Sequence, residues 1–129
     1  MKVLIAGLGT MGMSHALAQH HRPGGEIVGR VNRSPAALPE DLAGYSLFND
    51  FHDALAVTWP EVVVIATCSD SHADHAVAAL EAGAHVFVEK PLATTVADAR
   101  RVVDCARRRG RKHVVGYILR HHPSWQRLI

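Results

Sequence analysis

Short apolar runs alternate along this chain with segments whose apolar residues recur at helical spacing. The compact runs, several of them rich in β-branched residues, predict strands at Lys2–Ala6, Glu26–Val31, Ser46–Phe48, Val62–Ala66, His85–Glu89 and His113–Ile118. The fourth run is continuous and free of charge, which is typical of a strand in a parallel sheet that is covered on both faces.

Helices are expected between these strands. Met11–His20 has helical spacing, and Asp50 is placed to cap a short helix over Phe51–Val57. Two prolines interrupt the segment Asn32–Gly44, which therefore reads mostly as loop.

Two longer helices carry recognisable end signals. One is ended by Gly83 and has apolar residues at helical spacing, namely Ala73, Ala76, Val77 and Leu80. The other ends before Gly110 and is marked by Val96, Ala99, Val103 and Ala106. Thr95 and Asp98 at its start resemble a capping box, with Asp in the position usually held by Glu or Gln.

The alternation of strands and helices predicts the fold class, which is α/β with a Rossmann-type doubly wound parallel sheet. Right-handed crossovers place helices on both faces of such a sheet. The 129 residues suit one hydrophobic core, so we expect a single domain over residues 1–129.

Composition narrows the function classes. Hydrophobic residues make up 48% and charged residues 20% of the chain, as in ordinary globular proteins, and the net charge is only +2. No apolar run approaches the roughly 20 residues that span a bilayer, and the first residues show no signal-peptide pattern. Two cysteines are too few for a disulfide framework. We therefore expect a cytoplasmic protein that binds neither membranes nor nucleic acid.

Two further patterns are compatible with other functions, namely metal binding and nucleic-acid binding. His72 and His75 are spaced as i, i+3 on a predicted helix, but no third ligand with a metal-site spacing accompanies them, so no metal is expected. The basic run Arg107–Lys112 falls at a helix C-terminus, where cations interact favourably with the helix dipole, and it contains no aromatic residues. This run is better explained as a solvated helix end than as a nucleic-acid site.

The first strand leads directly into a glycine motif. Gly7, Gly9 and Gly12 match G-x-G-x-x-G between a strand and a helix, which is the context of a dinucleotide-binding turn. Gly7 permits the tight turn, Gly9 lets the backbone approach a pyrophosphate, and Gly12 allows close packing of helix on strand. Backbone amides at the helix start, including those of Thr10 and Met11, can face the phosphates.

The choice between NAD and NADP depends on the end of the second strand, about 20 residues further on, where an acidic residue binds the ribose 2′-hydroxyl of NAD. This chain has Asn32, Arg33 and Ser34 there. Asn32 does not repel a 2′-phosphate, and Arg33 and Ser34 can bind one, so we expect NADP in preference to NAD. The alternative is that Asn32 binds the hydroxyl of NAD while Arg33 is a solvated surface charge.

A later stretch resembles a known family. The segment from Ala78 to Ala93, which contains Glu89-Lys90-Pro91, closely resembles the Gfo/Idh/MocA family of glucose–fructose oxidoreductases and inositol dehydrogenases. The segment from Ala66 to His72 is similar to that family's A-T-P-N-x-x-H segment. The resemblance covers essentially the whole chain and is more specific than the glycine turn.

The resemblance implies roles for individual residues. Lys90 would lie beside the nicotinamide and hydrogen-bond the substrate hydroxyl, as the catalytic residue. Pro91 is expected to be cis and to aim Lys90 into the cleft. Further positions that would contact the cofactor are Thr67, Cys68, His72, Glu89 and Arg120. Cys68 replaces the family's usual proline, which leaves the shape of that loop open. Arg120 is equally well explained as a charged residue just past a strand.

The implied function is the cofactor-binding half of an NAD(P)-dependent oxidoreductase that transfers a hydride to or from a sugar, polyol or related substrate. Family members are more than twice as long, and their C-terminal substrate domain is absent from these 129 residues. We therefore expect nucleotide binding without turnover, and self-association through exposed apolar surface. The alternatives are a non-catalytic dinucleotide-binding module and the N-terminal half of a β-hydroxyacid dehydrogenase, whose opening G-L-G-x-M-G also fits.

Overall fold

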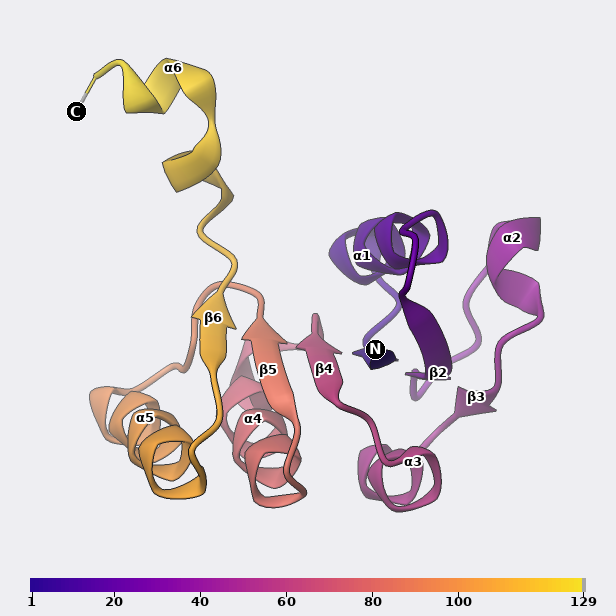
Figure 1. Cartoon of the computed structure of the whole chain (residues 1–129), viewed down its shortest axis with the longest axis horizontal. Helices are drawn as coiled ribbons and strands as arrows, with labels where there is room; N and C mark the ends of the chain where they lie inside the picture. Colours follow the sequence, from indigo (N-terminus) through magenta and orange to yellow (C-terminus); the bar gives the residue numbers. More distant parts are fainter. Residues whose placement is uncertain (129) are drawn as a thin grey trace.

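A six-stranded parallel sheet forms the centre of the computed structural model, which describes residues 1–128 and so leaves Ile129, the last residue of the expected domain, outside (Figure 1). The spatial strand order is β3-β2-β1-β4-β5-β6. The strands are β1 (Lys2–Ala6), β2 (Glu26–Val31), β3 (Leu47–Phe48), β4 (Val62–Ile65), β5 (His85–Val88) and β6 (His113–Val115). The expected doubly wound parallel sheet is confirmed, with its reversal of strand order between β1 and β4.

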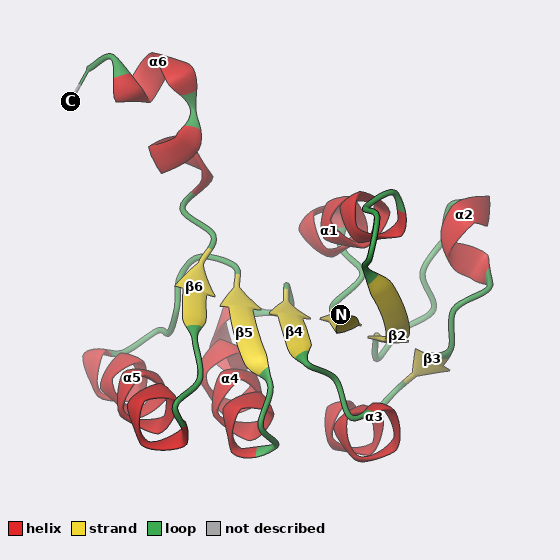
Figure 2. Ribbon diagram, viewed as in Figure 1, coloured by secondary structure: helices red, strands yellow, loops and turns green. Residues whose placement is uncertain are grey.

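Helices cover the sheet from both sides. Figures 1 and 2 show α1 (Thr10–His20) and α2 (Glu40–Ala43) on one side, opposite α3 (Phe51–Thr58), α4 (His72–Glu81) and α5 (Val96–Arg109). Neighbouring strand residues alternate between the two buried clusters, since Val3 and Ile5 pack toward α1 whereas Leu4 and Ala6 pack toward α3 and α4. This alternation explains why the central strands are apolar at every position.

Three strands end earlier than the sequence pattern predicts, and β4 ends at Ile65 rather than at Ala66. β5 ends at Val88, and β6 ends at Val115 rather than at Ile118. The last ladder bond runs from the amide of Gly116 to the carbonyl of Val88, at 2.8 Å. Because β5 ends at Val88, it has no further backbone groups to pair with the chain after Gly116. The chain then forms a 3₁₀ segment over Ile118–His121.

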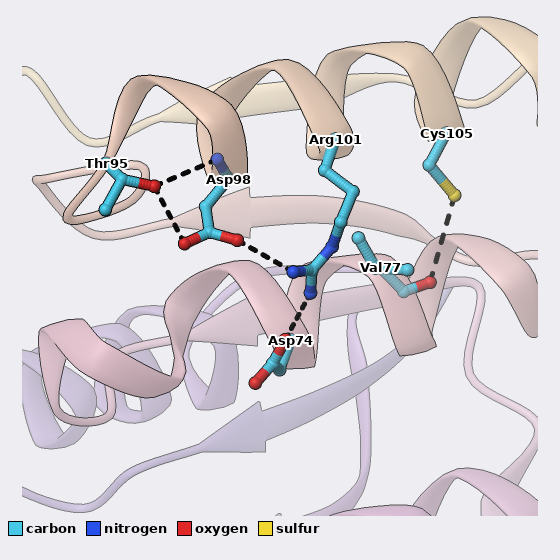
Figure 3. Close-up of polar contacts among 6 residues, drawn as sticks. All are labelled: Asp74, Val77, Thr95, Asp98, Arg101 and Cys105. Atoms are coloured by element: carbon cyan, nitrogen blue, oxygen red, sulfur yellow. Dashed lines mark hydrogen bonds and ion pairs between the residues drawn. The ribbon is translucent and has the colours of Figure 1, made fainter.

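The predicted helix caps are present with one difference. The Asp50 carboxylate accepts a 2.9 Å hydrogen bond from the amide of Asp53 at the start of α3. Thr95 likewise caps α5, accepting from the Asp98 amide at 3.1 Å, but its hydroxyl also donates to the Asp98 carboxylate at 2.9 Å (Figure 3). Asp98 is too short to reach back to the Thr95 amide as Glu does in a capping box, so it bonds the hydroxyl instead.

A polar contact joins α5 to α4 beside this cap. Arg101 bonds both Asp98, at 2.7 Å, and Asp74 on the neighbouring helix (Figure 3). Deeper in the same interface the buried thiol of Cys105 lies 4.0 Å from the carbonyl of Val77. Burial, with the nearby Glu81 carboxylate, raises the pKa of Cys105.

The C-terminal segment leaves the sheet. After β6 the chain runs through the 3₁₀ segment to α6 (Pro123–Gln126), which projects away from the sheet in Figure 1. The large apolar side chains of this C-terminal segment are exposed, namely Tyr117, Ile118, Leu119, Trp125 and Leu128. Across residues 1–128, every helix is too short or too polar to cross a bilayer.

Thr95→Ala should lower the free energy of unfolding by about 1 kcal/mol, because the α5 amide of Asp98 loses its side-chain acceptor. Urea unfolding followed by circular dichroism measures this change. Thr94→Ala, an exposed neighbour before the helix, is the matched control and should change stability by less than about 0.5 kcal/mol. Equal losses in the two variants would contradict the cap.

Candidate functional site

A cavity of about 510 Å³ opens at the carboxyl ends of β1, β2, β3 and β4. Such a position, beside the reversal of strand order, is where open α/β sheets bind ligands. The residues that follow these four strands line it, namely Gly7, Leu8, Gly9, Val31, Asn32, Arg33, Ser34, Asn49, Asp50, Phe51, His52, Ala66, Thr67, Cys68, Ser71 and His75.

The three glycines of the turn have different constraints. Gly7 has φ +88°, and a Cβ there would lie 2.3 Å from the carbonyl oxygen of Ala66. A Cβ at Gly12 would lie 1.8 Å from the Gly7 carbonyl oxygen. Gly9 is exposed, lines the cavity, and has no atom within 4 Å of an added Cβ. The fold therefore requires glycine at Gly7 and Gly12 but not at Gly9.

The start of α1 lies beside the cavity. Thr10 and Met11 begin the helix and are exposed, whereas Gly12 is buried against the sheet. The first amides of a helix have no partner within it, so those of Thr10 and Met11 can bind an anion. These three residues adjoin the cavity through Gly9 and are not among its lining residues.

Asn32 ties the glycine turn to the end of β2. Its side-chain oxygen accepts from the amide of Leu8 at 3.2 Å, and its side-chain nitrogen donates to the carbonyl of Ser34 at 2.5 Å. Both ends of the amide thus bind backbone, while the side chains of Arg33 and Ser34 are exposed at the cavity wall. An Asp at position 32 would lack the donor that reaches Ser34.

Another part of the cavity wall is a chain of polar contacts after β4. The Ser71 hydroxyl donates to the Cys68 carbonyl at 2.8 Å and lies 2.8 Å from the Thr67 hydroxyl, which in turn lies 3.3 Å from Nδ1 of His75. The His75 ring stacks on Phe51 with centroids 4.2 Å apart. Burial, followed by the positive potential of His52, lowers the pKa of His75, while Asp74 opposes the shift.

His72 lies away from the cavity, although the family segment placed it with Thr67 and Cys68. It is buried at the start of α4, and its Nδ1 and Nε2 lie 2.7 Å from the Pro91 carbonyl oxygen and 3.0 Å from the Thr67 carbonyl oxygen. The ring therefore joins the loop after β4 to the loop after β5, and its contacts are with backbone.

The segment Glu89-Lys90-Pro91 follows β5, one strand beyond the reversal. The Lys90–Pro91 peptide bond is cis, as expected, and Lys90 is exposed. Glu89 is buried, with one carboxylate oxygen 2.7 Å from Nε2 of His15 on α1 and the other accepting from the Lys90 amide at 3.3 Å. These contacts hold the backbone at Lys90 against the first helix.

Arg120 is separate from both the cavity and the Glu89-Lys90-Pro91 segment. It lies in the 3₁₀ segment beyond β6, is exposed, and its carbonyl accepts from the Gln126 side chain at 3.2 Å. Lys90, Glu89, Pro91 and Arg120 do not line the cavity, because they follow β5 and β6 whereas the cavity is bounded by the first four strands.

Several site residues were not expected from the sequence. Asn49, Phe51, His52 and His75 line the cavity, and His15 reaches Glu89 from α1. The spacing of His72 and His75 had suggested only a weak metal motif. Residues 1–128 contain no group of three or more His, Cys, Asp or Glu side chains placed to hold a metal ion.

Comparisons with known proteins agree with this geometry. The model of an oxidoreductase family with an NAD-binding Rossmann fold, Gfo/Idh/MocA, matches residues 1–117. The inositol 2-dehydrogenase of Salmonella typhimurium is 35% identical over 134 residues, covering 99% of this chain and 40% of that protein. The 4-carboxy-2-hydroxymuconate-6-semialdehyde dehydrogenase of a Sphingobium species is 34% identical, covering 98% of this chain and 41% of that protein.

A solved structure shows the same fold. Scyllo-inositol dehydrogenase from Lactobacillus casei, solved with bound NAD(H) and scyllo-inositol, matches with a TM-score of 0.86 at 24% identity, over 99% of this chain and 39% of that one. This chain thus spans about 40% of the length of the curated relatives it matches. Because the family model covers the sheet, the glycine turn and the Glu89–Pro91 segment together, the chain belongs to the Gfo/Idh/MocA oxidoreductase family and carries its NAD-binding Rossmann fold.

Proposed function

We propose that the cavity binds a nicotinamide dinucleotide, and that residues 1–129 are the cofactor-binding domain of an oxidoreductase acting on a sugar, polyol or related substrate. The observation that carries this proposal is the open space beside Gly9. The fold requires glycine at Gly7 and Gly12, but at Gly9 the space that a side chain would occupy is open and faces the cavity. A diphosphate at the start of α1 accounts for glycine at that position.

The two halves of the dinucleotide would take different parts of this surface. The adenosine half would occupy the cavity, and the diphosphate would bind the amides at Gly9–Gly12, which include those of Thr10 and Met11. From there the nicotinamide half would extend across the reversal of strand order toward the end of β5. Thr67 and Cys68 line the near side of this path, and Lys90 stands at its far end.

Lys90 is proposed as the catalytic residue. Bound NAD(P) would supply the hydride donor or acceptor. The Lys90 ammonium would hydrogen-bond the substrate hydroxyl and stabilise negative charge that develops on its oxygen. Glu89 and His72 would position Lys90 through the backbone on either side of it. Arg120 would approach the nicotinamide or the substrate.

The names of two kinds of relative support the substrate class. Those named inositol 2-dehydrogenase point to a cyclic polyol, and the semialdehyde dehydrogenase points to a related carbonyl compound. Because this chain spans about 40% of such relatives, its own residues would supply the cofactor-binding part of that activity.

NADP is the proposed preferred cofactor. Asn32 bonds backbone through both ends of its side chain, and it carries no negative charge that would repel a 2′-phosphate. The neighbouring Arg33 and Ser34 side chains are exposed at the cavity wall and can bind a 2′-phosphate. NAD would bind the same site without this interaction.

Gly9→Ala should abolish most dinucleotide binding without unfolding the protein. The backbone at Gly9, with φ −73° and ψ −170°, accepts alanine, and the added methyl meets no protein atom within 4 Å. The methyl would collide with the diphosphate, so calorimetric titration should show affinity for NAD and NADP reduced roughly tenfold or more.

The matched control is Gly44→Ala, since its added methyl also meets nothing within 4 Å. This variant should bind both dinucleotides as the unaltered chain does. Unchanged binding by Gly9→Ala, or no heat from either dinucleotide with the unaltered chain, would refute the proposed site.

Arg33→Ala should weaken NADP binding roughly tenfold and NAD binding by less than about threefold, because only NADP loses a charge-assisted hydrogen bond. The measurement is the ratio of the two dissociation constants by calorimetry. Arg100→Ala, an exposed arginine on α5, controls for the loss of a positive charge. Equal losses for NAD and NADP would show that Arg33 does not select the cofactor.

A further inference from the structure

The polar chain Ser71–Thr67–His75 determines which nitrogen of His75 carries a proton. Ser71 has one hydroxyl hydrogen and donates it to the Cys68 carbonyl, at 2.8 Å. The one assignment of hydrogens that makes all three contacts hydrogen bonds has Ser71 accepting from Thr67 in the 2.8 Å contact between the two hydroxyls. The Thr67 oxygen has then no hydrogen left for His75, so in their 3.3 Å contact Nδ1 of His75 is the donor.

A neutral imidazole with its hydrogen on Nδ1 has an acceptor at Nε2. The ring is held in place by stacking on Phe51, and it lines the cavity. Within residues 1–128, Nδ1 has Thr67 as its partner, whereas no protein hydrogen bond is recorded for Nε2. The cavity wall therefore presents a free hydrogen-bond acceptor to a ligand.

We propose that His75 determines specificity for the base by accepting a hydrogen bond from the 6-amino group of adenine through Nε2. This inference rests on the proposed function, because it needs the adenosine half of a dinucleotide in the cavity. With the diphosphate at Gly9 and the 2′ position at Arg33, the remaining cavity walls are Asn49–His52 and the Thr67–His75 side. The base is the part of the adenosine that lies between those two walls.

The surroundings of His75 keep its ring neutral. Burial lowers its pKa, and the positive potentials of His52 on α3, His72 on its own helix and Arg33 after β2 act in the same direction. Asp74 acts in the opposite direction and raises the pKa. Near neutral pH Nε2 thus stays an acceptor, and it becomes a donor only when the pH falls below the lowered pKa.

Asp50 is another acceptor in this part of the cavity. One of its carboxylate oxygens accepts from the Asp53 amide as the cap of α3, at 2.9 Å. A carboxylate at the cavity edge keeps its acceptor character regardless of Thr67, whereas His75 depends on the hydroxyl chain. A variant at Thr67 therefore separates the two acceptors.

The tautomer is tested first, on the unliganded chain. Long-range ¹H–¹⁵N spectra of the imidazoles at pH 8 should show a protonated Nδ1 and an unprotonated Nε2 for His75. The signals of His75 are assigned as those that disappear in the variant His75→Phe. The opposite tautomer would overturn the inference. This result does not depend on any ligand.

The second test compares adenine with hypoxanthine, in which a carbonyl oxygen replaces the 6-amino group. NAD and nicotinamide hypoxanthine dinucleotide are titrated calorimetrically at pH 8 into the unaltered chain. NAD should bind roughly tenfold more tightly, because the hypoxanthine oxygen faces an acceptor and leaves it unsatisfied. Equal affinities for the two dinucleotides would overturn the inference, while no binding of either would instead refute the proposed function.

Thr67→Val removes the hydroxyl that fixes the tautomer while keeping the shape of the side chain. The preference for adenine should fall to less than about threefold in this variant and persist in Thr67→Ser, which restores the hydroxyl. Thr94→Val is the matched control, because Thr94 is exposed before α5 and does not line the cavity, and its ratio of affinities should stay near tenfold. Loss of the ratio in Thr94→Val, or its persistence in Thr67→Val, would overturn the inference.

Discussion

The close packing of the first helix on the sheet is the constraint on which the rest of this site depends. At Gly12 a single added carbon would lie 1.8 Å from the carbonyl oxygen of Gly7, and at Gly7 it would lie 2.3 Å from that of Ala66. Because no side chain fits between these backbones, α1 begins directly at the carboxyl ends of β1 and β4. Its first amides are thereby placed beside the cavity, and His15 reaches Glu89 across the sheet edge at 2.7 Å.

Side chains that bind backbone hold the surrounding loops in register with this turn. Asn32 joins the glycine turn to the loop after β2, and His72 joins the loops after β4 and β5. In both cases a polar residue that the sequence suggests for cofactor binding instead contacts the backbone of the protein. Groups left for a bound molecule include the backbone at Gly9, the side chains of Arg33 and Ser34, and the ring of His75.

Local signals predicted much of the fold. Alternation of apolar runs with helical spacing indicated the parallel sheet, and Asp50, Thr95 and Gly110 marked helix ends that the structure confirms. The predicted end of β6 at Ile118 was wrong, because strand length depends on the partner strand, and β5 ends at Val88. Oligomeric state and cytoplasmic location stay predictions from the sequence.

The sequence by itself determined the fold class, the dinucleotide-binding turn and the family, because strand periodicity, the glycine spacing and Glu89-Lys90-Pro91 are properties of contiguous residues. Only the tertiary structure decided that His72 binds two loops, that His15 pairs with Glu89, and that His75 stands in the cavity on Phe51. These contacts join residues of different strands and helices, whose relative position is fixed by packing across the sheet. Spacing along the chain carries no information about such packing.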